Sequence, residues 1–354
     1  MTGSAGRGTL SRLSIPITGR WRSARPGPEE HSLKLKINKY YIPDPREPWA
    51  ARVRHRLLRR PVPSFPRTVQ LETQTGCNAD CVFCDYGVSY PKQPKGQVDW
   101  DLFRKIIDEC ARYRVRRFSP YLTNEPFADK RLLERLEYVN QKMPWCKVVV
   151  TTNAHYLVPE MVDRILSLRK PLHAIYISFQ GIEKEAYEAT MRGNMKFERT
   201  MENVTYLTDR IRKEKLARPE VWITMIDTKM IDAPRAIAYW KERGIRAKYT
   251  TLENRGGNII QIDKLQKSEV MTSYSTCTRL MKQAYIHFNG DVVLCCVDNS
   301  RKVVFGNLKE QSLHEIWNSP KAVEHRRRYL SHDFAGLPLC GTCKVDQERE
   351  ITNV

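Results

Sequence analysis

Three cysteines lie within one stretch of eight residues, Cys77-Asn-Ala-Asp-Cys81-Val-Phe-Cys84. Thiolates are soft ligands, and three in one short loop suit an iron–sulfur or zinc site better than a disulfide. A closed site of either kind takes four protein ligands, and no fourth cysteine or histidine stands close by in the sequence. The spacing therefore predicts a metal centre with one open position, where chemistry can occur.

The spacing of this loop, C-x3-C-x2-C, resembles the signature of the radical S-adenosylmethionine (radical SAM) enzymes. The resemblance implies that Cys77, Cys81 and Cys84 bind three irons of a [4Fe-4S] cluster. It implies that S-adenosylmethionine (SAM) chelates the fourth iron, and that Phe83 lies beside the adenine of SAM. The residues alone also fit an incomplete zinc knuckle or three unrelated core thiols.

A second set of cysteines lies near the C-terminus. Cys277, the run Gly-Asp-Val-Val-Leu-Cys295 and Cys340-Gly-Thr-Cys343 follow one another in an order that resembles the auxiliary-cluster domain of SPASM and twitch radical SAM enzymes. The full SPASM pattern needs seven cysteines, so the resemblance implies the shorter twitch form, with one [4Fe-4S] cluster on these four and with Cys296 spare. Four thiolates also suit a structural zinc, which stays open as an alternative.

Polar residues at predicted strand ends resemble the SAM-binding positions of the family. The family usually carries Gly-Gly-Glu-Pro after its second strand, and this chain carries Thr-Asn-Glu125-Pro, which lacks both glycines. The resemblance implies that Glu125 contacts the SAM amine and that Asn153, Ser178 and Gln180 bind the ribose hydroxyls. Arg192 resembles an arginine that pairs with the SAM carboxylate. By type alone, these are ordinary loop and turn residues.

Four further residues are interpreted from their position. Glu253 and Arg255 follow the last predicted strand, where contacts with the substrate are expected. Cys110 lies on the apolar side of a predicted helix and Cys146 directly precedes a predicted strand. Both of these cysteines are interpreted as structural.

Alternating apolar patterns predict six strands separated by helices. The strands are Thr68–Thr73, Arg117–Leu122, Lys147–Thr152, Ala174–Phe179, Val221–Ile226 and Arg246–Leu252. The helices are one that starts after Asp99 and then Lys130–Met143, Pro159–Leu168, Phe197–Lys215 and Pro234–Arg243. This alternation predicts an α/β fold with a parallel sheet and right-handed crossovers, either open or barrel-like. The family resemblance implies a partial (β/α)6 TIM-like barrel, with the site at the carboxyl ends of the strands.

The alternation stops after residue 252. The run Ala284–Cys295 predicts a hairpin with a two-residue turn at Asn-Gly, and Ser312–Leu330 predicts one helix. The predicted domains are therefore a basic, partly disordered N-terminal extension (1–65), a radical SAM partial barrel (66–255) and a small C-terminal iron–sulfur domain of twitch or SPASM type (256–354).

The composition limits the classes of protein. A chain of 354 residues with 41% apolar residues has room for one large domain and a small one. Eight of its ten cysteines fall into the two ligand-like sets when Cys296 is counted with the second, which favours a reducing cytoplasm over a disulfide scaffold. The sequence contains no signal-peptide pattern and no apolar run long enough to span a bilayer, so a soluble cytoplasmic protein is predicted.

The chain carries a formal net charge of +20. A zinc-stabilised nucleic-acid-binding protein is therefore an alternative of another class, although the aromatic–basic alternation of such proteins is absent and nucleic acid is not expected as a partner. Residues 1–28 contain five arginines and no acidic residue, which also fits an organellar transit peptide. Trp49–Arg60 predicts a short basic helix.

The predicted activity follows from the resemblance. In radical SAM enzymes the reduced cluster cleaves SAM to a 5′-deoxyadenosyl radical, which abstracts a hydrogen atom. Four-cysteine twitch domains occur there with dehydrogenases of aminocyclitols and sugar alcohols. The resemblance thus implies oxidation or epimerisation of a small polar substrate, with Cys296 as a candidate hydrogen donor and a flavodoxin- or ferredoxin-type reductase as partner. Maturation of a ribosomally made peptide is the alternative, although no leader-binding domain is recognised before the barrel.

Overall fold

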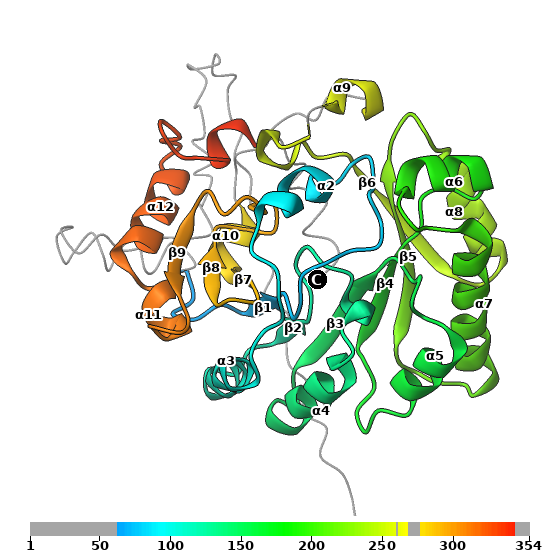
Figure 1. Ribbon diagram of the computed structural model, residues 1–354, viewed down its shortest axis with the longest axis horizontal. Helices are drawn as coiled ribbons and strands as arrows, with labels where there is room; N and C mark the ends of the chain where they lie inside the picture. The colour runs from blue at the N-terminus through cyan, green and yellow to red at the C-terminus, as the bar shows by residue number, and fades with distance from the viewer. Residues whose placement is uncertain (1–61, 260, 268–276, 344–354) are drawn as a thin grey trace, which may run out of the picture. The chain divides into compact units, whose positions relative to one another are not determined.

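The strands form one curved sheet (Figure 1). The computed structural model describes residues 62–259, 261–267 and 277–343. Its nine-stranded sheet has the order β6-β5-β4-β3-β2-β1-β7-β8-β9. The predictions for the N-terminal extension up to residue 61, including the basic helix, lie outside the described residues.

Six parallel strands run side by side in sequence order. They are β1 (Thr68–Leu71), β2 (Arg117–Ser119), β3 (Lys147–Thr152), β4 (Ala174–Ser178), β5 (Glu220–Asp227) and β6 (Arg246–Thr251). The predicted α/β fold with a parallel sheet is thereby confirmed. The first two strands end earlier than predicted, because the chain leaves the sheet there to form the loops described below.

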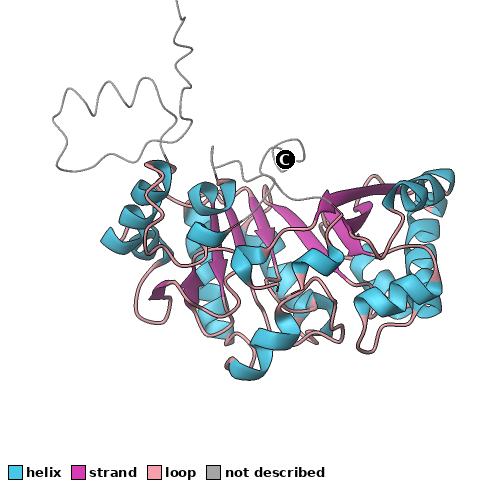
Figure 2. Cartoon of the chain, turned by 90° about the horizontal axis from the view of Figure 1, so that it is seen from above, coloured by secondary structure: helices cyan, strands magenta, loops and turns pink. Residues whose placement is uncertain are grey.

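Helices connect these strands and cover the outer side of the sheet (Figures 1 and 2). They are α3 (Trp100–Arg112), α4 (Leu132–Lys142), α5 (Pro159–Leu166), α6 (Lys184–Met191), α7 (Phe197–Lys213) and α8 (Ala233–Glu242). Asp99 caps α3 as expected, since its carboxylate accepts hydrogen bonds from the amides of Asp101 and Leu102. The sequence reading missed α6, which has only eight residues.

The two faces of the sheet differ in burial. Ile175, Ile177 and Ile223 point toward the helices and are fully buried. Their neighbours in the sequence point the other way, because side chains alternate along a strand. We define this opposite side as the helix-free face, which carries the partly exposed side chains of Arg117, Tyr176, Ser178, Trp222, Thr224 and Lys248.

The C-terminal strands continue the same sheet. β7 (Gln283–Ile286) pairs in parallel with β1, and β8 (Asp291–Val293) and β9 (Val304–Asn307) follow in antiparallel order. The predicted hairpin is present, but the prediction of a two-residue turn was wrong. The His287 amide donates to the Asp291 carbonyl at 2.9 Å, so three residues form the loop. Gly290 takes φ +95° there, where an added Cβ would lie 2.9 Å from the Asn307 amide oxygen.

The predicted helix Ser312–Leu330 is divided into α11 (Leu313–Trp317) and α12 (Pro320–Leu330). Pro320 explains the break, since it has no amide hydrogen and its ring blocks the preceding turn. Ser319 then starts α12, and its hydroxyl accepts from the Ala322 amide. The single-helix prediction was wrong because Pro320 was not read as a helix start.

The remaining helices are short, with three to five residues each. They are α2 (Tyr86–Ser89), η1 (Tyr90–Lys92), η2 (Pro126–Ala128), η3 (Arg255–Gly257), α9 (Ile262–Leu265), α10 (Thr278–Lys282) and η4 (Cys340–Thr342). Within the described ranges, no helix combines the length and the apolar composition needed to cross a bilayer.

Candidate active site

The first cysteine set lies in the loop between β1 and α2. The Cys84 amide donates to the Cys81 carbonyl at 3.0 Å, which folds the segment tightly, and none of the three thiols forms a disulfide. Burial, followed by the nearby Glu125 charge, raises the pKa of Cys77 to about 12. Burial and the charges of the other two thiols also raise the pKa of Cys81. Thiols that resist ionisation here while lying near one another fit a metal-binding loop, which releases their protons when it is loaded.

Contacts from distant parts of the chain fix the shape of this loop. The Arg192 guanidinium donates to the Asp80 carbonyl at 2.6 Å and lies 2.9 Å from the Asp80 carboxylate. Gly193 takes φ +63°, and a Cβ there would lie 2.6 Å from the Asn78 carbonyl oxygen. Arg192, predicted to pair with SAM, is thus bound to the cysteine loop itself. Its proposed contact with the SAM carboxylate stays a prediction.

Glu125 and Asn153 lie together beside Cys77, at the carboxyl ends of β2 and β3. The Glu125 carboxylate accepts from the Thr152 hydroxyl at 2.6 Å and from the Asn153 amide at 2.8 Å. Burial raises the pKa of Glu125 to about 7, although these hydrogen bonds oppose the shift. The Asn153 side chain lies 2.8 Å from that of Asn78 and 3.8 Å from the Cys77 sulfur. Two residues predicted from strand ends are therefore adjacent to the first cysteine.

The other three residues predicted to bind SAM differ in their burial. Phe83 is buried in the main apolar core. Gln180 is also buried, and its side-chain oxygen accepts from the Ile226 amide at 2.9 Å, so it links the ends of β4 and β5. Ser178 ends β4 on the helix-free face and is partly exposed. The roles of all three in cofactor binding stay predictions.

The second cysteine set is assembled from three separate elements. Cys277 precedes α10, Cys295 follows β8, and Cys340 and Cys343 lie at the start and end of η4. Burial raises the pKa of Cys343 to about 12, and the charge of Cys277 adds to the shift. Burial and then Cys277 and Cys343 raise the pKa of Cys340 as well. Four thiols that lie far apart in the sequence are thus within electrostatic reach of one another.

A single zinc ion and a [4Fe-4S] cluster place different demands on four thiols. Within the described residues, no three or more His, Cys, Asp or Glu side chains are close enough to hold a single metal ion. One zinc ion draws its four ligands to about 2.3 Å, whereas a [4Fe-4S] cluster places each thiolate on a different iron. By residue type alone, four thiolates suit either metal.

The residues between the two sets include the predicted substrate contacts. Glu253 forms a two-pronged ion pair with Arg279, at 2.8 and 2.9 Å. Arg255 lies 3.4 Å from the Asp85 carboxylate, next to the first set. Burial opposes the Arg255 charge, but Cys84, Asp85 and Cys296 favour it, and its pKa is raised overall. Arg255 thus lies within electrostatic reach of the first cysteine set and of Cys296, the neighbour of Cys295.

Sequence reasoning missed a polar group beside the first loop. Glu72 accepts from the Thr123 hydroxyl at 2.7 Å, and its other oxygen lies 2.8 Å from His287 Nδ1. His287 Nε2 is buried and has no hydrogen-bond partner among the described residues. The three residues border a cavity of about 10 Å³, room for one water, with a wall that also includes Thr75, Tyr86, Ser89, Gln93, Asn299 and Arg301. Glu72 and Thr123 each follow a strand of the parallel sheet, and this position was the one sequence feature that could have indicated the group.

His325 is a second residue that the sequence did not single out. It lies on α12, and its Nε2 is 3.5 Å from the Cys340 sulfur. Burial lowers the pKa of His325 to about 4, so its ring is neutral at ordinary pH. No cysteine or histidine spacing in the sequence indicated this contact, because α12 approaches the second set only in the folded chain.

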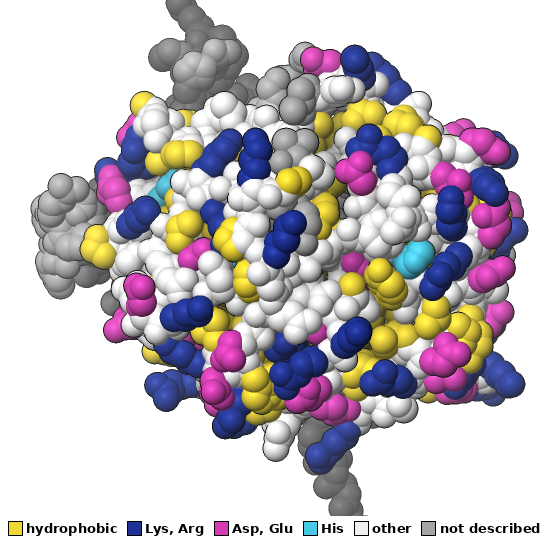
Figure 3. Space-filling view, in the orientation of Figure 1, with side chains coloured by type: hydrophobic (Ala, Val, Ile, Leu, Met, Phe, Trp, Pro, Cys, Tyr) yellow, Lys and Arg dark blue, Asp and Glu magenta, His cyan; other side chains and the backbone are white. Residues whose placement is uncertain are grey.

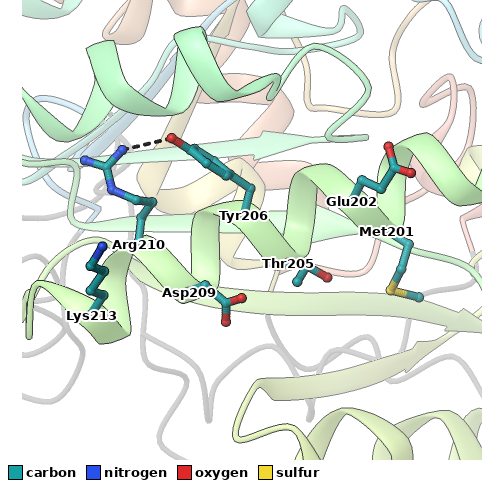
Figure 4. Close-up of a pocket in the computed structure, with 7 residues that line it drawn as sticks. All are labelled: Met201, Glu202, Thr205, Tyr206, Asp209, Arg210 and Lys213. Atoms are coloured by element: carbon teal, nitrogen blue, oxygen red, sulfur yellow. Dashed lines mark hydrogen bonds between the residues drawn. The ribbon is translucent and has the colours of Figure 1, made fainter.

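A larger opening lies away from both cysteine sets. Figure 4 shows an open pocket of about 510 Å³ over one side of α7, lined by Met201, Glu202, Thr205, Tyr206, Asp209, Arg210 and Lys213. Arg210 already donates to the Tyr206 hydroxyl and forms ion pairs with Asp163 and Glu214. No cysteine lines this pocket and its Arg210 is already engaged, so we place the active site at the cysteines.

Comparison with family models decides the family. Residues 71–226 match the radical SAM superfamily, and residues 277–344 match SPASM, an iron–sulfur cluster-binding domain. The chain belongs to the radical SAM superfamily. As a radical SAM enzyme it binds a [4Fe-4S] cluster and SAM, and its SPASM match indicates auxiliary iron–sulfur in place of the zinc alternative. The two matches include both cysteine sets.

Named relatives agree with this family. A 2-deoxy-scyllo-inosamine dehydrogenase of Niallia circulans that depends on SAM is 21% identical over 78% of this chain and 91% of the relative. The structure of BtrN in complex with SAM (AdoMet) and 2-DOIA matches 79% of this chain and 93% of BtrN, with 19% identity and a TM-score of 0.55. Streptococcus suis SuiB bound to precursor peptide SuiA matches 80% of this chain and 70% of SuiB, with 16% identity and a TM-score of 0.57. At these identities the solved structures show the shared fold.

Proposed function

We propose that this radical SAM enzyme oxidises or epimerises an alcohol carbon of a small polar substrate, such as a sugar or an aminocyclitol. The observation that carries the proposal is the second cysteine set, whose order Cys277, Cys295, Cys340, Cys343 resembles the twitch type. It is supported by the dehydrogenase relative, whose match extends over 91% of that protein. An oxidation needs an acceptor for one electron after hydrogen abstraction, and an auxiliary cluster can serve as one.

The first loop has the role of holding the cofactors. In our proposal Cys77, Cys81 and Cys84 bind the catalytic cluster and leave one iron for SAM. When bound, the cluster and SAM supply a 5′-deoxyadenosyl radical that removes a hydrogen atom from the substrate. Glu125 accepts a hydrogen bond from the SAM amine, while Asn153, Ser178 and Gln180 contact its ribose. Asp80 and Arg192 hold the loop in place, so that the open position keeps a fixed direction.

The residues between the cysteine sets have the role of contacting the substrate. Glu253 and Arg255 provide an acceptor and a donor of hydrogen bonds near both sets. For an oxidation, the alcohol carbon loses a hydrogen atom, then an electron and the hydroxyl proton, and becomes a carbonyl carbon. For an epimerisation, a thiol returns a hydrogen atom from the opposite side, and Cys296 is the candidate donor.

Two other readings are less well supported. Peptide maturation is a second candidate, since SuiB carries a bound precursor peptide, but that likeness concerns the fold. A nucleic-acid-binding role is motivated by the net charge of +20. On the face seen in Figure 3, however, Lys and Arg side chains are scattered among acidic ones and do not form one basic stripe.

The proposal includes the electron donor and the compartment. A low-potential cluster needs a reductase of flavodoxin or ferredoxin type, and ten cysteines without a disulfide among the described ones favour the reducing cytoplasm.

Anaerobic turnover tests the proposed function. The reduced protein is incubated with SAM and a panel of polyols and aminocyclitols, and the products are analysed by mass spectrometry. We expect 5′-deoxyadenosine together with an alcohol that has lost two hydrogens. When the reaction is run in D2O, an epimerisation would instead give an epimer that has gained one deuterium from the solvent. Cleavage of SAM that depends on a peptide, and on none of the small alcohols, would instead support peptide maturation.

A further inference from the structure

Among the residues that the structure describes, two basic side chains on the helix-free face have no acidic partner. We propose that Lys248 on β6 and Arg117 on β2 form a subsite for an anionic group of the substrate, either a carboxylate or a phosphate. The identity of the bound molecule as a small polar substrate rests on the proposed function. The subsite itself rests on the side chains of this face.

The strand register places Lys248 in line with the cofactor-binding edge. Lys248 is paired with Thr224, and Thr224 is paired with Ser178, so the three side chains form one row. Ser178 is a proposed ribose contact. Two strand spacings separate it from Lys248, which corresponds to about 10 Å. A group bound at Lys248 is thus within the length of a small sugar or cyclitol derivative from the proposed cofactor position.

The positive charges of this pair are not paired with a carboxylate of the described residues. Within the described residues, neither Lys248 nor Arg117 forms an ion pair, and Arg117 Nε is buried without a hydrogen-bond partner. The nearby carboxylate on the same face, Glu220, is already engaged by Arg218 and Arg246. Burial, followed by the charge of Arg117, lowers the pKa of Lys248, so the two cations lie within electrostatic reach of each other.

Aromatic rings flank the lysine. Its Nζ lies 4.8 Å from the centre of the Tyr176 ring and 5.7 Å from that of Trp222. Both rings are partly exposed on the helix-free face. A flat apolar surface next to a cation suits a ring with carbon–hydrogen faces and one acidic substituent. Fixed polar groups on such a surface orient the ligand.

The charge of the subsite restricts the class of substrate. A sugar acid or a phosphorylated polyol gains a charge-assisted contact at Lys248 and Arg117. An aminocyclitol with a protonated amine at this place meets two like charges and is disfavoured. We therefore infer that the substrate is an acidic polyol or sugar.

Aldehyde labelling tests the subsite without turnover. The SAM-loaded holoenzyme is treated with pyridoxal 5′-phosphate, whose aldehyde condenses with an unprotonated amine to an imine and water. Borohydride then reduces the imine, and peptide mapping locates the label. Pyridoxal, which has the same aldehyde without the phosphate, is the matched probe. We expect labelling of Lys248 to be about tenfold faster with the phosphorylated aldehyde, as one charge-assisted contact predicts.

Matched variants separate the subsite from general reactivity. R117Q is expected to remove most of the rate advantage of the phosphorylated probe. Arg246 lies on β6 like Lys248 but forms an ion pair with Glu220, so R246Q is expected to retain that advantage. Inorganic phosphate is expected to protect Lys248, and calorimetry is expected to detect phosphate binding to wild type but not to K248Q. Equal labelling by both probes, or phosphate binding unchanged in K248Q, would overturn the proposal. Labelling as expected without any polyol oxidation would instead refute only the proposed function.

Discussion

The two cysteine sets are built in different ways. The first occupies one loop of eight residues after β1, and its three thiols stay close because the chain between them is short. The second gathers four thiols from α10, β8 and η4, over 67 residues from Cys277 to Cys343. A local loop can be read from sequence spacing. A site assembled from distant elements needs the fold to bring its ligands together.

The number of ligands in each set agrees with its proposed task. Three cysteines leave one iron open, and residues at neighbouring strand ends, Glu125 and Asn153, lie beside the first thiol. Four cysteines close the second set, and a contact from the segment after β6 helps to hold it: the Asn254 side chain donates to the Thr342 carbonyl at 2.6 Å. An open cluster suits reaction with SAM, and a closed cluster suits electron transfer.

Loss of a ligand from the first set is expected to have the largest effect on activity. C81A should reduce formation of 5′-deoxyadenosine below detection, because the cluster needs all three thiolates to present its open iron. The measurement is chromatography of anaerobic reactions with dithionite. C146A, which removes a buried cysteine outside both sets, should retain cleavage; equal activity in C81A and wild type would reject the assignment of the loop.

Loss of ligands from the second set is expected to separate SAM cleavage from oxidation. In C340A/C343A, 5′-deoxyadenosine should still form, while the oxidised product falls about a hundredfold because the electron acceptor is lost. The ratio of the two products in one reaction measures this separation. C296A is the matched control, since Cys296 is not a proposed ligand and an oxidation does not use it. An unchanged product ratio in the double variant would show that the second cluster has no part in oxidation.

Much of this comparison could be predicted from the sequence. The spacing of Cys77, Cys81 and Cys84 and the six alternating strands indicated the family and the parallel sheet, because both depend on local pattern. Pairing of β7 with β1 was not predicted, since strand order depends on long-range packing. The contacts of His287 with Glu72 and of His325 with Cys340 were missed for the same reason. Pro320 was misread because a proline inside an apolar pattern can start a helix as well as end one.

Substitution of Glu125 is expected to have an intermediate effect, confined to the first set. E125Q should weaken SAM binding about tenfold above neutral pH, since an amide replaces a charged acceptor for the amine. Equilibrium dialysis with labelled SAM measures the affinity. E253Q, which changes a carboxylate nearer the second set, should leave SAM affinity unchanged.

The proposed contact between Glu125 and SAM also predicts the direction in which SAM affinity changes with pH. Burial raises the pKa of Glu125 to about 7, so its carboxylate charge develops only as the pH rises through about 7. SAM affinity of wild type should therefore increase over this range, and that of E125Q should change less. The effect on stability is opposite: the raised pKa favours the folded state below the ordinary value of 4.5, and this contribution is lost as the pH rises through about 7. An identical pH profile for both proteins would contradict the contact.

The smallest expected effect concerns the stability of the second region. S319A removes the hydroxyl that caps α12, the helix that carries His325, and should lower the free energy of unfolding by about 1 kcal/mol. Denaturant titration measures the change. SAM cleavage should be unaffected, because the contact that α12 makes with a cysteine is that of His325 with Cys340 in the second set. A loss of SAM cleavage in S319A would show that the two sets are structurally coupled.

The most direct test of two separate clusters is the iron and sulfide content of the anaerobically purified protein. Wild type should contain about eight irons and eight sulfides per chain, as two four-iron clusters require. The variant C77A/C81A/C84A and the variant C340A/C343A should each retain about four. About four irons per chain in wild type would contradict two separate clusters. Stoichiometric zinc at the second cysteine set, in place of a second cluster, would contradict them as well.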